Sequence, residues 1–235
     1  MMKKNGFTLA EVLITLAIIG VVATMTLPAL MTNTGEQQAK TGIKKAINTL
    51  AEAAQMNAAV AGYDFSNLAA ESSAINSSSA DEEQSMASLL RTRTVVDYTT
   101  TLDGTSDPVP KGANTSGTHV KTSTGVADRF VTLRDGMIIL YNTADTTNTN
   151  YQAQQDDGLP LGYIITVDTN GVKGPNTLSN CVANGGTKAG TDDGTTAATV
   201  CNDKKARAIN DRFQVKLRGT RVEPYGAAAT WAFQN

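Results

Sequence analysis

One charged side chain lies within the longest apolar stretch of this 235-residue sequence. Glu11 is the only charged residue from Phe7 to Gly35. A carboxylate at the centre of a membrane helix costs on the order of 2.5 to 3.5 kcal/mol on insertion scales. The chemistry that this residue offers is therefore ion pairing, and we expect a cationic partner to neutralise it.

The apolar stretch is long enough to cross a membrane. Phe7–Met31 contains 25 residues, which as a helix span about 37 Å, against a hydrocarbon core of ~30 Å. Lys3 and Lys4 precede it and place this end of the chain on the cytoplasmic side. Pro28 removes one helical hydrogen bond, so we expect a kink or a locally melted turn there.

A second, amphipathic pattern follows over residues 32–62. Its apolar positions recur every three or four residues, which predicts one face of a helix; they are Ala39, Ile43, Ile47, Leu50 and Ala54. Lysines and a glutamate lie off this face. We expect one long helix whose second half packs against a sheet.

The remaining residues, 63–235, predict a globular domain with an antiparallel sheet of four to six strands. A capping pair, Ser79 and Glu82, predicts a short helix over 80–91. Segments rich in branched and aromatic residues predict strands at 94–102, 129–142, 162–168 and 211–224. Turns are expected at Asp135-Gly136 and Gly219, and residues 103–118 and 170–210 are expected to be surface loops. The fold class is α+β.

Composition argues against a nucleic-acid surface and leaves the redox state of two cysteines open. The net charge is −2 and 18% of residues are charged, without the basic excess that nucleic-acid binding requires. Cys181 and Cys201 are too few for a cysteine-only zinc site. In an oxidising compartment their disulfide would stabilise the domain by roughly 3 kcal/mol in the chain-entropy model. Otherwise they are two free thiols.

The sequence contains no recognisable catalytic constellation. His119 lies in a Gly/Thr/Ser-rich segment without a nucleophile motif, so we expect a surface histidine and no enzymatic activity. Asp168, Asn170 and Asn176 offer oxygen ligands around a glycine, which suits calcium, but the full calcium-loop pattern is absent. Asp and Asn at such positions are also common turn formers. We therefore expect no cofactor, with calcium as the weaker alternative.

The N-terminus resembles that of type IV prepilins and of the pseudopilins of type II secretion systems. In GFTLAEVLITLAIIGVV, Gly6 ends a short basic leader, Phe7 follows, and Glu11 occupies the fifth mature position. Pro28 falls at mature position 22. VDTNGVKGPN, residues 167–176, is similar to a turn that precedes the last strands of many pseudopilin-like proteins.

The resemblance implies a precursor with a leader peptide at residues 1–6, cut between Gly6 and Phe7 by a prepilin peptidase that also N-methylates Phe7. Residues 7–31 would form the helix of the membrane and filament core. The new amine on Phe7 would be the cation that pairs with Glu11 of a neighbouring subunit. The chain would wait in the bacterial inner membrane as a single-pass protein with its globular domain in the periplasm, or outside the cell once assembled.

Among functions, we expect a filament subunit of a type II secretion system. Its implied partners are prepilin peptidase, other pilin or pseudopilin subunits in a homo- or hetero-polymer, and an inner-membrane assembly platform. Small residues at four positions of the apolar helix would allow close helix packing; they are Ala10, Ala17, Gly20 and Ala23. The alternatives are a type IV surface pilin, a DNA-uptake minor pilin, a membrane-anchored adhesin or binding protein, a plain signal anchor and a cleaved signal peptide.

Overall fold

The computed structural model describes residues 8–68, 85–91, 96–101, 129–141, 162–171, 173–174, 176–181, 198–204 and 206–235. By its contacts the chain divides into two compact units, Met1–Gln38 and Ala39–Asn235. The predicted limits of the leader, membrane segment and globular domain stay predictions.

A single helix, α1, runs from Leu9 to Ala61, as the sequence predicted. It ends where Gly62 adopts a positive φ of 78° and its amide donates to the carbonyl of Asn57 at 3.2 Å. The backbone stays helical through residues 28–35, so the melted turn expected at Pro28 is not observed. The kink at Pro28 stays a prediction.

The amphipathic half of α1 contributes one wall of the core in the second unit. All five residues of the predicted apolar face are buried, at 6% exposure or less; they are Ala39, Ile43, Ile47, Leu50 and Ala54. Lys45 and Glu52 on the opposite side are exposed. Burial of this face supplies the hydrophobic stabilisation that holds the helix on the sheet.

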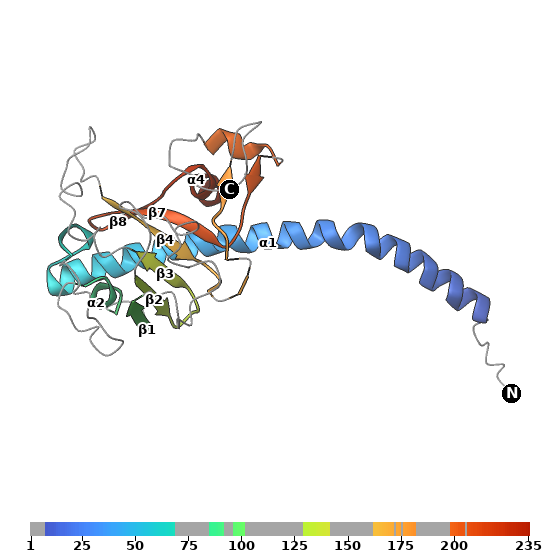
Figure 1. Ribbon diagram of the computed structural model, residues 1–235, viewed down its shortest axis with the longest axis horizontal. Coiled ribbons are helices and arrows are strands. Elements are labelled where there is room, and N and C mark those ends of the chain that lie inside the picture. The colour runs from blue at the N-terminus through green and yellow to red at the C-terminus, as the bar shows by residue number, and fades with distance from the viewer. Residues whose placement is uncertain are drawn as a thin grey trace. The chain divides into compact units, whose positions relative to one another are not determined.

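The sheet has six strands in the order β1-β2-β3-β4-β7-β8, with every neighbouring pair antiparallel (Figure 1). Its strands are β1 (Val96–Thr101), β2 (Arg129–Leu133), β3 (Ile138–Tyr141), β4 (Tyr163–Asp168), β7 (Arg212–Arg218) and β8 (Arg221–Pro224). All six fall within the predicted strand segments. Gly136 and Gly219 have positive φ values of 90° and 57° in the predicted turns. The α+β fold is thus as expected.

Side chains alternate between the two faces of the sheet. One face joins α1 in the core through residues such as Val131, Ile165 and Val215. The other face is also buried in the central strands, and there it is partly polar. Asp168 on β4 and Arg212 on β7 lie on that face, with no exposed surface at either residue.

A C-terminal helix and a two-stranded sheet complete the unit, and neither was predicted. The small sheet pairs β5 (Asn180–Cys181) with β6 (Arg207–Ala208), and a 3-10 turn, η3, covers Ala198–Asn202. The helix α4 (Ala227–Gln234) contacts η3, β5, β7 and β8. The cationic groups of Lys40 and Arg207 lie 4.2 and 4.3 Å from the centre of its Trp231 ring, within the range of cation–π contacts.

Two short elements, α2 and η1, also belong to the second unit. The helix α2 covers Met86–Arg91, and Ser85 caps it by accepting a hydrogen bond from the Ser88 amide at 3.0 Å. The cap predicted at Ser79 and Glu82 lies outside the described residues. A 3-10 turn, η1, covers Phe65–Asn67.

The turn after β4 packs directly on α1 at Gly42. A Cβ atom on Gly42 would lie 2.7 Å from Cβ of Thr169, closer than side-chain carbons approach in folded proteins. Thr169 is itself held, because its amide and hydroxyl both donate to the carbonyl of Asp211 at 2.9 Å. The absence of a side chain at Gly42 is therefore required for this contact.

We expect Gly42→Ala to destabilise the second unit by about 1 to 3 kcal/mol, because the added methyl group overpacks the contact with Thr169. Gly35→Ala is the matched control on the same helix, since a Cβ there meets no atom within 4 Å, and we expect its effect to stay within about 1 kcal/mol. Denaturant unfolding of the detergent-solubilised chain, followed by fluorescence of its single tryptophan, measures both. Equal stability of the two variants would contradict the close-packing explanation.

Candidate functional site

The N-terminal site is described from Thr8 onward. Gly6 and Phe7, the predicted cleavage and methylation residues, lie outside the described residues. Thr8 directly precedes the first residue of α1, and Glu11 lies in the first helical turn. The structure therefore places Glu11 at the start of the apolar helix and not at its middle.

Thr8 and Glu11 form a reciprocal capping arrangement. The amide and the hydroxyl of Thr8 donate to Oε2 of Glu11 at 2.9 and 2.8 Å. In return, the Glu11 amide donates to the Thr8 hydroxyl oxygen at 3.3 Å. This is the capping box of a Thr-x-x-Glu sequence, which satisfies donors that a helix start leaves open. This cap was not predicted, although the Thr8 to Glu11 spacing in the sequence carries the signal.

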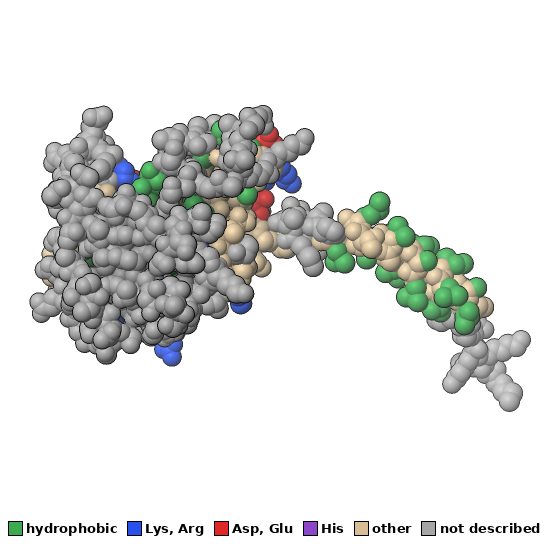
Figure 2. Space-filling view, in the orientation of Figure 1, with side chains coloured by type: hydrophobic (Ala, Val, Ile, Leu, Met, Phe, Trp, Pro, Cys, Tyr) green, Lys and Arg blue, Asp and Glu red, His purple; other side chains and the backbone are tan. Residues whose placement is uncertain are grey.

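The helix beyond Glu11 presents apolar side chains on all sides. Leu9–Leu27 is long and apolar enough to cross a membrane, and in the described part of the chain none of this segment is buried. Figure 2 shows hydrophobic side chains exposed along the face of this helix that is in view. Three threonine hydroxyls in this segment donate to backbone carbonyls of their own helix, at 2.9 to 3.0 Å; they belong to Thr15, Thr24 and Thr26. Such bonds make a hydroxyl compatible with an apolar environment.

The small residues predicted to allow helix packing fit this surface. Ala10, Ala17 and Gly20 are exposed, Ala23 is partly exposed, and no atom lies within 4 Å of a Cβ built on Gly20. The surface is open to another helix or to lipid. Their role in packing stays a prediction.

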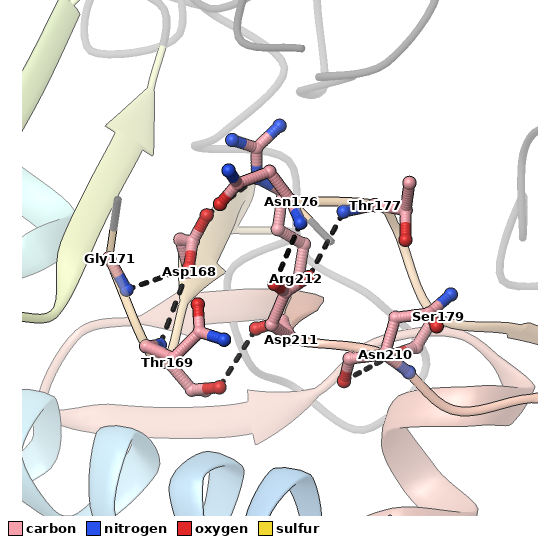
Figure 3. Close-up of polar contacts among 10 residues, drawn as sticks. Asp168, Thr169, Gly171, Asn176, Thr177, Ser179, Asn210, Asp211 and Arg212 are labelled. Atoms are coloured by element: carbon pink, nitrogen blue, oxygen red, sulfur yellow. Dashed lines mark hydrogen bonds and ion pairs between the residues drawn. The ribbon is translucent and has the colours of Figure 1, made fainter. Parts of the chain in front are cut away.

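A second polar cluster lies where β4 and β7 meet, and it contains the predicted calcium residues (Figure 3). Asp168 and Arg212 are directly opposite each other in the β4–β7 register. Nε of Arg212 donates to Oδ2 of Asp168 at 2.7 Å. Oδ1 of Asp168 accepts the amides of Asn170 and Gly171 at 3.3 and 3.0 Å. Asp168 thus shapes the turn that follows β4 and is neutralised by a buried arginine.

Asp211 holds the next segment of the chain in the same way. Its carboxylate accepts the amides of Asn176 and Thr177 at 2.7 and 3.0 Å. Leu178 forms a parallel bridge with Arg212, so residues 176–179 run beside the start of β7. Asp211 and Arg212 were not singled out from the sequence, because a charged pair at the edge of a strand normally indicates a solvated end.

Asn176 connects the two carboxylates. It is buried with a positive φ of 51°, a conformation that asparagine tolerates better than most residues. With its amide nitrogen facing the turn, it donates to Oδ2 of Asp168 at 3.2 Å and to the carbonyls of Gly171 and Lys173 at 2.8 and 3.0 Å. Buried residues such as Asn176 and Cys181 correct the expectation that 170–210 is a surface loop throughout.

This geometry supports the turn-forming role of Asp168, Asn170 and Asn176. The oxygens of Asp168 already accept hydrogen bonds from a guanidinium and from backbone amides, and a cation would compete with all of them. In the described part of the chain, no three His, Cys, Asp or Glu side chains are grouped as metal ligands. The absence of a cofactor stays a prediction with calcium as the weaker alternative, and the nearby Arg212 argues against calcium.

The cysteines are paired, as the oxidised alternative predicted. Cys181 on β5 and Cys201 on η3 form a disulfide with a Cα–Cα distance of 5.3 Å, and both are buried. The bridge ties η3 to the small sheet beside α4. His119, expected to be a surface residue, lies outside the described residues.

Burial dominates the ionisation of Asp168. Loss of solvent raises the pKa of this carboxyl group to about 6, and the hydrogen bond and charge of Arg212 lower it less than burial raises it. The folded state therefore holds the proton more tightly than the unfolded chain. Binding of this proton therefore adds to the free energy of unfolding. The contribution is fully present below about pH 4 and is lost as the pH rises through about 6.

We expect Asp168→Asn, which resembles the protonated side chain, to lack this pH dependence. The free energy of unfolding of the variant, relative to the unsubstituted chain, should rise by up to about 3 kcal/mol between pH 4 and pH 7. Denaturant unfolding at a series of pH values, followed by tryptophan fluorescence, measures this difference. If the free energy of unfolding of Asp168→Asn, relative to the unsubstituted chain, falls as the pH rises, the ion pair with Arg212 outweighs the effect of burial.

Comparison with known proteins gives one match, and it covers the N-terminal site. Residues 1–27 match the family model of the prokaryotic N-terminal methylation motif. No curated protein and no solved structure matches the chain significantly. The match includes Gly6, Phe7 and Glu11. The chain thus begins with the prokaryotic N-terminal methylation motif, the signal of type IV prepilin-like precursors.

Proposed function

We propose that this chain is a structural subunit of a pilin-like filament, cut after Gly6, methylated on Phe7 and assembled through α1. The observation that carries this proposal is the position of Glu11. Its carboxylate lies in the first turn of a helix whose apolar segment is not buried by any of the residues that the structure describes. A helix of this kind lies in lipid before assembly and against other copies afterwards.

Cleavage would supply the missing cation. A cut before Phe7 creates a positive amine four residues before Glu11, and methylation leaves that charge in place. In an apolar filament core, the amine of one copy and the carboxylate of the next neutralise each other. Removing one partner of such a buried pair costs about 3 to 5 kcal/mol, because the other charge is left unpaired. The pair therefore sets the register between subunits.

Within this class we favour a pseudopilin of a type II secretion system, working with a prepilin peptidase, other subunits and an inner-membrane platform. The similarity of residues 167–176 to a pseudopilin turn supports this choice. The cytoplasmic N-terminus and the external globular domain follow from Lys3 and Lys4. A type IV surface pilin or a DNA-uptake minor pilin is the alternative within the class. A membrane-anchored adhesin is the alternative outside it.

The proposed role is structural and not enzymatic. In the described residues, the buried carboxylates of Asp168 and Asp211 accept hydrogen bonds from Arg212 and from the backbone of the neighbouring turns. These contacts organise the fold around Asp168 and Asp211. These contacts do not account for the exposed apolar helix at the N-terminus, and the proposed function has to explain that helix.

Cleavage and methylation of the N-terminus can be tested directly. Intact mass spectrometry of the chain from cells that export it should show loss of residues 1–6 and one added methyl group on Phe7. The membrane peptidase that recognises the motif accounts for both changes. A mature chain that begins beyond residue 31 would identify a cleaved signal peptide and contradict the proposal.

The role of Glu11 in filament assembly can be tested by substitution. Glu11→Ala should lower incorporation into sheared filaments by a factor of about 100 or more, because the amine of the next copy loses its partner. Membrane insertion should survive, since the variant is more apolar. Glu36→Gln, which removes a carboxylate farther along α1, is the matched control and should assemble normally. An anchored adhesin would tolerate both substitutions, so normal assembly of Glu11→Ala would contradict a filament role.

A further inference from the structure

Asn170 and Gly171, in the turn after β4, form an asparagine–glycine pair, and such a pair is chemically reactive. Asparagine that precedes glycine loses its side-chain amide more readily than asparagine before other residues. The reason is steric, because glycine has no side chain that hinders the approach of its own backbone nitrogen. The surroundings of this pair therefore decide how fast it reacts.

The reaction is deamidation, and it begins when the Gly171 nitrogen attacks the side-chain carbonyl carbon of Asn170. A bond forms between these two atoms and the nitrogen gives up its proton. The side-chain amino group takes up a proton and leaves as ammonia, which closes a succinimide ring. Water then opens the ring at one of its two carbonyl groups and gives aspartate or isoaspartate. The net change is hydrolysis of an amide to a carboxylic acid and ammonia, without oxidation.

The electrophilic end of this reaction is open to attack. Asn170 is exposed, so water reaches it directly. Its backbone amide donates to Asp168, but in the described part of the chain its side-chain amide has no hydrogen-bond partner. The side chain is therefore free to change rotamer and to bring its carbonyl carbon towards the next backbone nitrogen.

The nucleophilic end, in contrast, is held by the fold. The Gly171 amide is buried and donates to Oδ1 of Asp168 at 3.0 Å (Figure 3). A hydrogen bond to a carboxylate is stronger than one to a neutral acceptor, and it retains the proton that the attack must release. The charge of Asp168 also opposes the negative charge that develops on the nitrogen as the proton leaves. Both effects slow the attack.

The fold cannot avoid the reactive pair by replacing its glycine. Gly171 has a positive φ of 69°, and a Cβ atom there would overlap the carbonyl oxygen of Gly136 in the turn between β2 and β3. Isoaspartate would add one carbon to the backbone at position 170 and displace Gly171 from this close approach. Slow deamidation therefore preserves the junction between the two turns.

We propose that Asn170 is a deamidation site that the folded chain keeps unreactive, and that Asp168 protects it by holding the Gly171 amide. This inference is independent of the proposed function, because it depends only on contacts within the second unit. It gives Asp168 a chemical role besides turn formation. The modification proceeds when the turn opens, so that deamidated Asn170 records the opening.

The reaction can be followed in the full chain, both folded in detergent and unfolded in denaturant at the same pH. Trypsin cleaves after Lys173 and Lys188, so mass spectrometry reports Asn170 and Asn184 in separate peptides. Asn184 also precedes a glycine, and in denaturant it gives the intrinsic rate of such a pair. We expect Asn170 to deamidate about 10 to 100 times more slowly in the folded chain than in denaturant, the factor for one hydrogen bond to a charged group. Equal rates in the two states would overturn the proposal.

Asp168→Asn tests the protecting residue itself. The carboxylate accepts the Gly171 amide on Oδ1 and the Arg212 guanidinium on Oδ2, whereas a carboxamide has only one oxygen. We expect that oxygen to face Arg212, the charged donor, so that the Gly171 amide loses its acceptor. Deamidation at position 170 should then be about tenfold faster in the folded variant. An unchanged rate would mean that Asp168 does not protect, and a slower rate would identify it as a base.

Asp211→Asn is the matched control. Asp211 is also a buried carboxylate that accepts two backbone amides, but they belong to Asn176 and Thr177. We expect this substitution to leave the deamidation rate at Asn170 within about twofold of the unsubstituted chain. Equal acceleration by the two substitutions would reduce the effect of Asp168 to general loosening of the turn and overturn its specific role.

Hydrogen exchange at the Gly171 amide gives a second measurement that needs no substitution. Exchange and attack both require the same nitrogen to leave Asp168 and to lose its proton. We therefore expect folding to slow the two reactions by factors that agree within about tenfold. NMR of the ¹⁵N-glycine-labelled chain measures the exchange, and it decides alone if Asp168→Asn does not fold. Rapid deamidation of Asn170 while the Gly171 amide resists exchange would contradict the protection.

Discussion

A carboxylate in an apolar environment needs a donor or a cation, and Glu11 is the residue on which this constraint acts. Its own helix supplies part of the solution, since the amide and hydroxyl of Thr8 satisfy Oε2. Hydrogen bonds from neutral donors do not cancel the charge, so a cation is still required. The methylation motif matched at residues 1–27 suggests a source for it, because the proposed cleavage before Phe7 would expose an amine close to Glu11 in the sequence. Chain anchoring alone would not require an acid at this position.

The second unit is subject to a different constraint, because it has to fold from a chain that is rich in Thr, Ser, Asn and Gly. Its apolar core is formed by one face of α1 and one face of the sheet. The long connections have little apolar surface to contribute, and polar contacts hold their described parts. Asp168 and Asp211 each accept two backbone amides from the segment after β4, and the Cys181–Cys201 disulfide fixes the segment before β6. A buried ion pair adds little net stability, and we infer that the Asp168–Arg212 pair serves to specify one conformation.

The sequence predicted those parts of the molecule that depend on periodic apolar patterns. The α1 face at Ala39–Ala54 and the six strands follow from spacing and turn residues, and the structure has them. Helix α4 was missed because its five buried residues are mostly alanines, which carry little periodic signal. The Asp168–Arg212 pair was missed because it depends on register: the two residues are 44 positions apart and meet only when β4 pairs with β7. The Thr8 cap is local, and its Thr-x-x-Glu spacing was available in the sequence.

The proposed pairing of Glu11 with the Phe7 amine of a neighbouring copy can be tested directly. The quantity to measure is the distance between the Glu11 carboxyl carbon and the Phe7 nitrogen of different copies. Filaments isolated from cells that make both a ¹³C-labelled and a ¹⁵N-labelled chain allow solid-state NMR to detect contacts between copies alone. We expect a carbon–nitrogen correlation at about 4 Å, the separation of an ion pair. Filaments in which no correlation links the two residues of different copies would contradict it.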